Sequence, residues 1–424
     1  MTIVLIIWLG LLLLGTPIYI SLGIASLLNI LISGFSPLTI PQRVLNAANS
    51  FPLLAAPFFI LMGNVMNTSG VTRRIFNFAN VLVGWLRGGL GHANVVASVF
   101  FAGMSGSAVA DAGGLGTIEI AAMKEGGYDV DFSAGITAAS SVIGPIIPPS
   151  LPMVIYAVLA DTSVGGLFIG GVIPGLLMAV SLMIMVAIFA RKRKYPKNAF
   201  PTPSVIWKAF KNSVWALLAP AILFLGIASG IFTPTEAAIV AAFYAIILGL
   251  FVYKEFSVKD LPKMIIMTVE TNGVVLALVM TAVLFGWNLA VAGIPQALGN
   301  FLTSVSRNPF VIIAIINVFL LIVGCFMEGN AAQMILVPIL APIAQSLGIN
   351  PIQLGILIVL NLMVGTITPP VGIVLYVTAN VAQISFERVL KATLPFLIPL
   401  VIVLLLVSYV PAITTFLPNL VMGK

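Results

Sequence analysis

Long apolar runs separated by short polar turns dominate the chain. Ile3–Ile32, Ala134–Ala160 and Ile352–Asn380 are clear examples, and an α-helix needs about 20 apolar residues to cross a bilayer core of roughly 30 Å. The strict alternation of apolar and polar residues that a membrane β-barrel requires is not found. We therefore predict an all-α polytopic membrane protein. Nine full spans are expected, over residues 3–32, 48–67, 134–160, 164–190, 214–231, 234–253, 264–293, 352–380 and 394–417.

The composition supports this fold class. Hydrophobic residues make up 60% of the chain and charged residues 7%, whereas a soluble domain carries roughly 25% charged residues. The surface must therefore face a lipid bilayer. The net charge of +7 does not indicate a nucleic-acid partner, because the basic residues lie in loops, where the positive-inside rule accounts for them. One cysteine, Cys325, and one histidine, His92, offer neither a disulfide framework nor a transition-metal cluster.

The loop charges orient the spans. Seven basic residues and no acidic one lie between residues 191 and 211, so this loop is expected on the cytoplasmic side. Three lysines within 254–263 follow two crossings later and fall on the same side. To keep the remaining basic loops on the cytoplasmic side, segments 92–125 and 310–347 must each enter and leave the membrane on one side. Re-entrant hairpins and pairs of full crossings both satisfy this condition, and the charges do not distinguish them.

The two halves of the chain repeat one another. Gly144-x-Ile-x-Pro-Pro149 matches Gly365-x-Ile-x-Pro-Pro370, and other glycines recur at similar offsets. Each half contains two spans, a short amphipathic segment (75–86 or 296–307), a hairpin, a broken span and a final span. The single crossing 214–231 lies between the halves, and an odd number of linking spans gives them opposite orientations. This is the inverted-topology plan of many secondary transporters.

Each repeat carries two consecutive prolines in the middle of an apolar span, and these open the helix. Proline removes a backbone donor, and freed carbonyls in lipid are costly unless something satisfies them. A simple kink is one interpretation. We favour coordination of a hard cation near the midplane, Na⁺ above others, because only oxygen ligands are on offer. The predicted sodium ligands are Ser105, Asp111, Ser140, Ser141, Gly144, Pro148, Glu328, Asn361, Gly365, Thr366 and Thr368.

The two hairpins turn at small and polar residues, within Gly103–Gly114 and at Glu328–Asn330. Small residues let half-helix ends approach a ligand closely, and helix N-termini favour anions. An ordinary tight loop is the alternative, but polar tips at membrane depth persist only where they line a cavity or the protein interior. Asp111 and Glu328 are candidates to ligate a cation, relay a proton or cap a half-helix. The predicted substrate-binding residues are Ser105, Gly106, Ser107, Ser150, Gly329 and Asn330.

One short motif suggests an enzyme. Gly103-Met-Ser-Gly106 matches the Gly-x-Ser-Gly of rhomboid intramembrane proteases. A serine nucleophile needs a positioned base, and His92 lies upstream rather than on a later helix facing Ser105. A four-residue match is common in such a chain, so we predict no catalytic residue. No nucleotide-binding motif couples the chain to ATP, which leaves an ion gradient as the expected driving force.

Three motifs together resemble the large membrane subunit of tripartite ATP-independent periplasmic (TRAP) transporters, over essentially the whole chain. They are Ser105-Gly-Ser-Ala-Val-Ala-Asp111, Gly144-Pro-Ile-Ile-Pro-Pro-Ser150 and Gly365-Thr-Ile-Thr-Pro-Pro-Val-Gly372. The resemblance implies a Na⁺-coupled importer of organic acids, such as sialic acid or C4-dicarboxylates, in the bacterial inner membrane, with two or more Na⁺ per cycle. It also implies two partners, a periplasmic substrate-binding protein and a small four-helix membrane subunit. A stand-alone Na⁺/anion symporter is the alternative.

The resemblance further implies an elevator mechanism, in which hairpins and broken helices move as one block against a scaffold. The moving transport domain is expected at 92–160 and 310–380, with connecting arms at 75–91 and 296–309. No arginine lies in the expected cavity, so we predict that backbone amides, hydroxyls and bound Na⁺ hold the substrate anion. The expected scaffold comprises 1–74, 161–213 with its cytoplasmic loop, the linking helix 214–231, 232–295 and the C-terminal helix 381–424.

Overall fold

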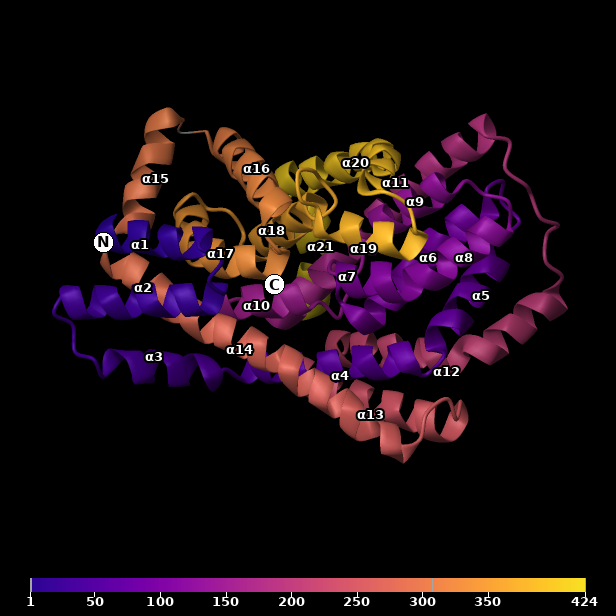
Figure 1. Ribbon diagram of the computed structural model, residues 1–424, viewed down its shortest axis with the longest axis horizontal. Coiled ribbons are helices and arrows are strands. Elements are labelled where there is room, and N and C mark those ends of the chain that lie inside the picture. Colours follow the sequence, from indigo (N-terminus) through magenta and orange to yellow (C-terminus); the bar gives the residue numbers. More distant parts are fainter. Residues whose placement is uncertain (1, 307, 424) are drawn as a thin grey trace.

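The computed structural model describes residues 2–306 and 308–423, and within these ranges the chain is all α-helical, without β-strands (Figure 1). Seven helices of the described part are long and apolar enough to cross a membrane. They cover 51–68, 164–192, 203–228, 234–252, 258–291, 309–326 and 386–409. The all-α polytopic fold predicted from the apolar runs is confirmed.

The first half of the chain contains one hairpin and one interrupted span. The hairpin runs from α6 to α8, and the interrupted span is α9 with α10. The elements are α1 (Thr2–Leu13), α2 (Ile18–Ile32), α3 (Thr39–Ala48), η1 (Phe51–Leu54), α4 (Ala55–Thr68), α5 (Val71–Val83), α6 (Gly89–Ser105), α7 (Ala108–Ala110), the π-helical turn η2 (Asp111–Leu115), α8 (Gly116–Glu125), α9 (Val130–Ser141), α10 (Leu151–Ala160) and α11 (Val164–Lys192).

The second half repeats this order after the linking helix α12 (Pro203–Ala228). Its hairpin is α16 with α17, and its interrupted span is α18 with α19. The elements are α13 (Pro234–Ile247), η3 (Leu248–Val252), η4 (Val258–Asp260), α14 (Leu261–Val291), α15 (Ile294–Val305), α16 (Pro309–Phe326), α17 (Gly329–Ser346), α18 (Pro351–Gly365), α19 (Ile373–Ala382), α20 (Phe386–Tyr409) and α21 (Ala412–Met422).

Two of the predicted spans are each divided in two, which corrects the sequence-based prediction. The run 3–32 forms α1 and α2, because Gly15 takes a φ of +79° between them and Pro17 precedes the second helix. The run 394–417 is shared between α20 and α21, and Pro411 lies at the junction. Apolar composition alone does not reveal these turns, because the residues at the turns are as apolar as their neighbours.

Two further helices differ from the prediction. The linking helix α12 begins at Pro203, well before the predicted start at residue 214, because its first turns are polar and were assigned to the loop. Helix α3 was not predicted as a span and is amphipathic, with one side packed on α14. The two predicted amphipathic segments correspond to α5 and α15, each starting a few residues earlier than expected.

The packing of the helices repeats between the halves. Helix α2 packs on α14 as α13 packs on α4, and α4 and α14 also contact each other. Helix α9 packs on α20, and its counterpart α18 packs on α11, the counterpart of α20. Each half therefore contributes equivalent helices to shared contacts, as expected of two interlocked inverted repeats.

In both hairpins the tip meets the break of the adjacent span. At the second hairpin, a Cβ added to Gly365 at the end of α18 would lie 2.6 Å from Cα of Gly324, near the tip. At the first, a Cβ added to Gly106 would lie 2.5 Å from the carbonyl oxygen of Pro149. Each tip therefore reaches only as far as the break in the adjacent span.

Helices α11 and α20 contact the interrupted spans of both halves. Both helices were assigned to the scaffold by residue range, at 161–213 and 381–424. In the structure α20 packs on α9, α11, α18 and α19, and α11 packs mainly on α6, α18, α20 and α21, with further contacts to α12 and, through Phe168 against Phe59, to α4. Figure 1 shows α20 and α11 beside α9, whereas α3, α4, α13 and α14 lie along the opposite edge.

Candidate functional site

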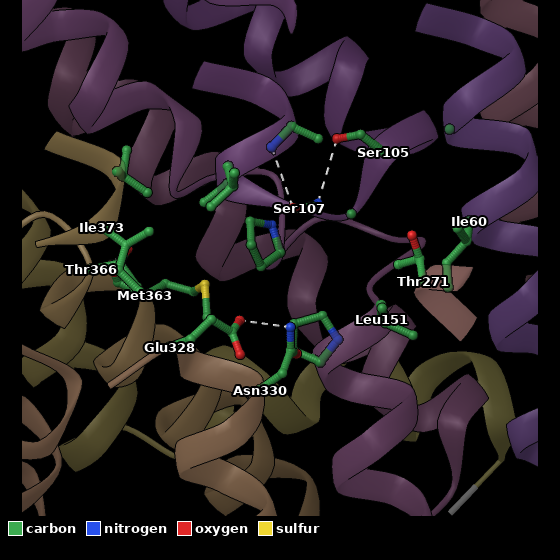
Figure 2. Close-up of a pocket in the computed structure, with 18 of the residues that line it drawn as sticks. Ile60, Ser105, Ser107, Leu151, Thr271, Glu328, Asn330, Met363, Thr366 and Ile373 are labelled. Carbon is green, nitrogen blue, oxygen red and sulfur yellow. Dashed lines mark hydrogen bonds between the residues drawn. The ribbon is translucent and has the colours of Figure 1, made fainter. Parts of the chain in front are cut away.

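The hairpin tips and the two helix breaks surround one cavity of about 250 Å³. Figure 2 shows the serines of the first tip facing Glu328 and Asn330 of the second across this space. Helices α4 and α14 form the remaining wall. The lining residues are Ile60, Gly63, Asn64, Asn67, Ser105–Ala110, Pro145, Leu151, Pro152, Thr271, Val275, Glu328, Asn330, Met363, Thr366, Ile373 and Val374.

The first tip is built from three small polar positions. Helix α6 ends at Ser105, and Gly106 takes a φ of +58°, a left-handed conformation that favours glycine. Ser107 then caps α7, because its Oγ accepts a hydrogen bond from the backbone amide of Ala110 at 3.4 Å. The amide of Ser107 donates to Oγ of Ser105 at 3.5 Å. The serines thus hold the tip in one conformation at the edge of the cavity.

The second tip depends on one carboxylate. Glu328 is the N-cap of α17, where Oε2 accepts from the amide of Ala331 at 3.0 Å. Its Oε1 accepts from Nδ2 of Asn330 at 2.8 Å, and both side chains face the cavity. A negative charge therefore lies beside the positive end of a helix dipole, in contact with the open space.

Each break is tied to neighbouring backbone. At the first break Oγ of Ser150 donates to the carbonyl of Pro145 and accepts from the amide of Met153 at 3.2 Å. At the second, the amide of Val371 donates to the carbonyl of Cys325 in the hairpin at 3.2 Å. The Pro148-Pro149 and Pro369-Pro370 bonds are both cis. The breaks and tips therefore form two matched junctions, one per repeat.

The structure brings six of the predicted site residues to the cavity wall and leaves the others behind it. Asn361 on α18 bonds with Asn317, and Thr368 donates to its own helix at Val364. Gly144, Pro148, Ser150, Gly329 and Gly365 lie in the junctions without lining the cavity. The six that line it are Ser105, Gly106, Ser107, Glu328, Asn330 and Thr366.

Asp111 and Ser140 lie deeper than the sequence suggested. Asp111 is in η2, one turn beyond the first tip, and is fully buried. Its Oδ1 accepts from Ser98 at 3.4 Å, while Oδ2 has no partner within the described part of the chain. Ser140 donates to Oδ1 of Asn94 at 2.8 Å and is not among the residues that line the cavity. Ser141 donates to a carbonyl of its own helix.

A buried polar network that sequence reasoning missed supports the first junction. Asn94 donates to Glu119 at 2.6 Å and to Thr137 at 2.8 Å, and it accepts from Ser140. All four side chains are fully buried. An amide bonded on both its nitrogen and its oxygen fixes α6 against α8 and α9. Polar residues spread over three separate apolar segments gave no local signal of this association.

Three polar residues of α4 and α14 at the cavity wall were also missed. Asn64 and Asn67 line it from α4, and Thr271 lines it from α14. Asn64 donates to Oγ1 of Thr268 at 3.1 Å and so joins α4 to α14. The sequence did contain evidence for these residues. Two asparagines three residues apart in an apolar span lie on the same face of the helix, and polar side chains in a membrane span usually face the protein interior rather than lipid.

The arrangement does not support serine catalysis. His92 and Ser105 lie on the same helix α6, 13 residues apart, which separates them by roughly 20 Å along its axis. A base must lie within hydrogen-bond distance of its nucleophile. Within residues 2–306 and 308–423, no group of three His, Cys, Asp or Glu side chains forms a transition-metal site either. The polar groups of the cavity are suited to binding rather than to bond cleavage.

Comparison with known proteins agrees with this arrangement. Residues 5–413 match the family described as the DctM component of tripartite ATP-independent periplasmic transporters. The chain is 44% identical to the sialic acid TRAP transporter large permease protein SiaM of Vibrio cholerae over 98% of both chains. It is 42% identical to the C4-dicarboxylate TRAP transporter large permease protein DctM of Pseudomonas aeruginosa over 94% of both.

A solved structure shares the fold at low sequence identity. The Alcanivorax borkumensis YdaH transporter, described as having an unusual topology, superposes with a TM-score of 0.66. The superposition covers 87% of this chain and 86% of that one at 15% identity, which is informative about the fold alone. The chain therefore belongs to the DctM component family of tripartite ATP-independent periplasmic transporters, and it is a multi-pass permease of the bacterial inner membrane rather than an enzyme.

Proposed function

We propose that the chain is the Na⁺-coupled transport subunit of an importer for an organic acid of the sialic acid or C4-dicarboxylate class. Relatives named as large permeases for these two classes are 44% and 42% identical to it. The proposed partners are a periplasmic substrate-binding protein and a small four-helix membrane subunit. The observation that carries the proposal is the single cavity enclosed by two hairpin tips and two helix breaks.

Sodium is the cation that this lining suits. The polar side chains that line the cavity are asparagines, serines, threonines and one glutamate, and a hard cation prefers such oxygen ligands. The unpartnered oxygen of Asp111 and the carboxylate of Glu328 supply negative charge, one near each junction. We propose one Na⁺ at each junction of a tip with a break, and thus two or more ions per cycle.

The substrate anion is proposed to bind between these ions. The first residues of α10 and α19 and the start of α17 border the cavity, so three helix N-termini contribute partial positive charge. Neither lysine nor arginine is among the described lining residues. Bound Na⁺ must then supply the full positive charge, so removing Na⁺ should abolish substrate binding. Undiminished binding in Na⁺-free buffer would contradict this scheme.

Transport is proposed to follow an elevator mechanism with a larger moving block than the residue ranges suggested. Because α11 and α20 pack on the broken helices, we assign them to the block together with both hairpins. The scaffold then comprises α1–α4 and α12–α14. Helices α5 and α15 join scaffold to block and serve as the arms.

The test is reconstitution of the chain with its small membrane subunit in liposomes, with the binding protein added outside. Uptake of labelled sialic acid and of labelled succinate is measured under an inward Na⁺ gradient. We expect uptake of one of the two acids, and we expect it to stop without the gradient or without the binding protein.

The other outcomes separate the alternatives. Uptake that needs Na⁺ but not the binding protein would identify a stand-alone symporter. Uptake that needs the binding protein but not Na⁺ would refute the coupling ion. Transport of neither acid by a complex that binds its delivery protein would refute both substrate classes.

A further inference from the structure

A second, larger cavity lies away from the central site, where arm helix α5 packs on the beginning of α12. Its volume is about 750 Å³, against about 250 Å³ for the central cavity. Arg74 of α5 and Lys208 and Lys211 of α12 line it, together with the aromatic side chains of Phe78, Trp215 and Tyr253. Cations and aromatic surfaces therefore share one groove, which has no part in the central cavity.

The positive charge of the groove is only partly neutralised. Arg74 pairs with Glu255 at 3.1 Å and lies over the Tyr253 ring, with Cζ 3.9 Å from its centroid. Lys208 and Lys211 are exposed and belong to none of the ion pairs found in the described part of the chain. Two lysines and one arginine against a single glutamate leave a surplus of positive charge for an anionic ligand.

The groove lies where a membrane protein meets lipid headgroups. It follows the basic loop that the positive-inside rule puts on the cytoplasmic side, and α12 becomes apolar after its first turns. Trp207 and Trp215 are 66% and 49% exposed on this stretch, as expected of aromatic residues at the interface of a bilayer. An anion that binds here also meets an exposed apolar wall, which a small soluble anion would not use.

We propose that this groove binds an anionic glycerophospholipid of the inner leaflet. The phosphate contacts Lys208 and Lys211, and the glycerol and acyl chains lie along Trp215 and neighbouring apolar residues. Basic pockets between helices on the cytoplasmic side are suited to such headgroups. The lipid would reinforce the contact between α5 and α12, where Oγ of Ser213 already donates to the carbonyl of Arg74 at 3.0 Å.

Native mass spectrometry tests the proposal independently of transport. The full chain, purified with its small membrane subunit, is titrated with phosphatidylglycerol, with phosphatidylcholine and with inorganic phosphate. We expect phosphatidylglycerol to bind in preference to the zwitterionic lipid. The double variant Lys208→Gln/Lys211→Gln should lose at least tenfold in affinity for it, because each lysine near the membrane surface contributes about 1 kcal/mol.

The matched control is Lys259→Gln/Lys263→Gln, which removes two exposed lysines on the same predicted side but outside the groove. This control should bind phosphatidylglycerol as the unmodified chain does. Equal loss in both double variants, no loss in the groove variant, or equal binding of both lipids would overturn the proposal. Displacement of phosphatidylglycerol by millimolar inorganic phosphate would instead identify a site for a soluble phosphate and would also overturn it.

Discussion

At the scale of single residues, Glu328 has two tasks that substitution can separate. Its carboxylate caps α17 through the amide of Ala331, and the same group faces the cavity and bonds with Asn330. The cap requires only an acceptor oxygen, whereas attraction of Na⁺ requires charge. Glutamine retains the first property and lacks the second.

Glu328→Gln should therefore leave the protein folded and weaken Na⁺ activation of uptake. We expect the half-saturating Na⁺ concentration to rise at least tenfold, because about 1.4 kcal/mol corresponds to a factor of ten. The measurement is uptake by proteoliposomes as a function of external Na⁺.

Glu236→Gln is the matched control for this variant. Glu236 also lies at a helix start, where it completes the capping box of α13 with Thr233, but it is exposed on the scaffold. Na⁺ activation should be unchanged in this control. Equal Na⁺ activation curves for Glu328→Gln and the unmodified chain would remove Glu328 from the cation site.

A second prediction concerns Asp129 at the start of α9. The Tyr195 hydroxyl, which donates at 2.7 Å, and the Arg193 guanidinium together lower the pKa of the Asp129 carboxyl below its ordinary value of 3.8. A lowered folded-state pKa stabilises the fold above pH 3.8, and this contribution is lost as pH falls through the folded-state pKa. The side chain is 58% exposed, so the contribution is about 1 kcal/mol at most.

Asp129→Asn should therefore reduce the free energy of unfolding by up to about 1 kcal/mol at pH 7. The difference from the unmodified chain should shrink as pH falls from 4 toward 3. Equilibrium unfolding in mixed micelles measures both values. Glu125→Gln, which removes an exposed carboxylate outside the ion pairs of the described residues, is the control. A difference that stays constant down to pH 3 would show that the carboxylate charge is not the cause.

At the scale of elements, consecutive prolines set the two breaks. Pro148-Pro149 follows α9, and Pro369-Pro370 follows α18. Replacing either pair with Ala-Ala restores backbone donors and removes the clash with the preceding turn, so the span can close into one helix. The carbonyl groups that are free at the break would then accept hydrogen bonds within the helix. Each double variant should show weaker Na⁺ activation of uptake than the unmodified chain.

The control for these variants is Pro220→Ala in the linking helix α12, where a single proline lies inside an otherwise continuous helix. This variant removes a proline without closing a break, so its Na⁺ activation should be unaffected. Normal Na⁺ activation in both Ala-Ala variants would mean that the openings have only a structural role.

The sequence predicted these elements unevenly, for physical reasons. Proline pairs interrupt a helix locally, and small polar residues in an apolar segment indicate a turn. Both breaks and both tips were therefore predicted at the correct positions. The turn between α1 and α2 was not, because Gly15 and Pro17 lie among apolar residues that are equally compatible with one long helix. The direction in which a side chain points could not be predicted from the sequence either. Ser140 lies close to the break in sequence, yet it points to Asn94 rather than to the cavity.

At the scale of the whole molecule, the proposed grouping of helices into block and scaffold depends on contacts far apart in sequence. The residue ranges separated α11 and α20 from the hairpins because they follow the broken spans as ordinary apolar helices. Their packing on α9 and α18 is a property of the inverted repeat, in which each final span crosses to the other half. Periodicity within one segment contains no information about that exchange.

Relative movement of block and scaffold can be tested by a crosslink between them. A Cβ added to Gly114 in the proposed block would lie 3.6 Å from Cγ of Asn67 in helix α4, so side chains at these two positions are in contact. In a Cys325→Ala background, oxidation of Asn67→Cys/Gly114→Cys should reduce uptake at least tenfold, and reduction should restore it. The matched pair Gly23→Cys/Thr281→Cys joins two scaffold helices, where the added Cβ lies 3.5 Å from Cγ2 of Thr281. If the block slides against a fixed scaffold, oxidation of this second pair leaves uptake intact. Full transport by protein crosslinked between block and scaffold would exclude the elevator, because the proposed movement must separate these two positions.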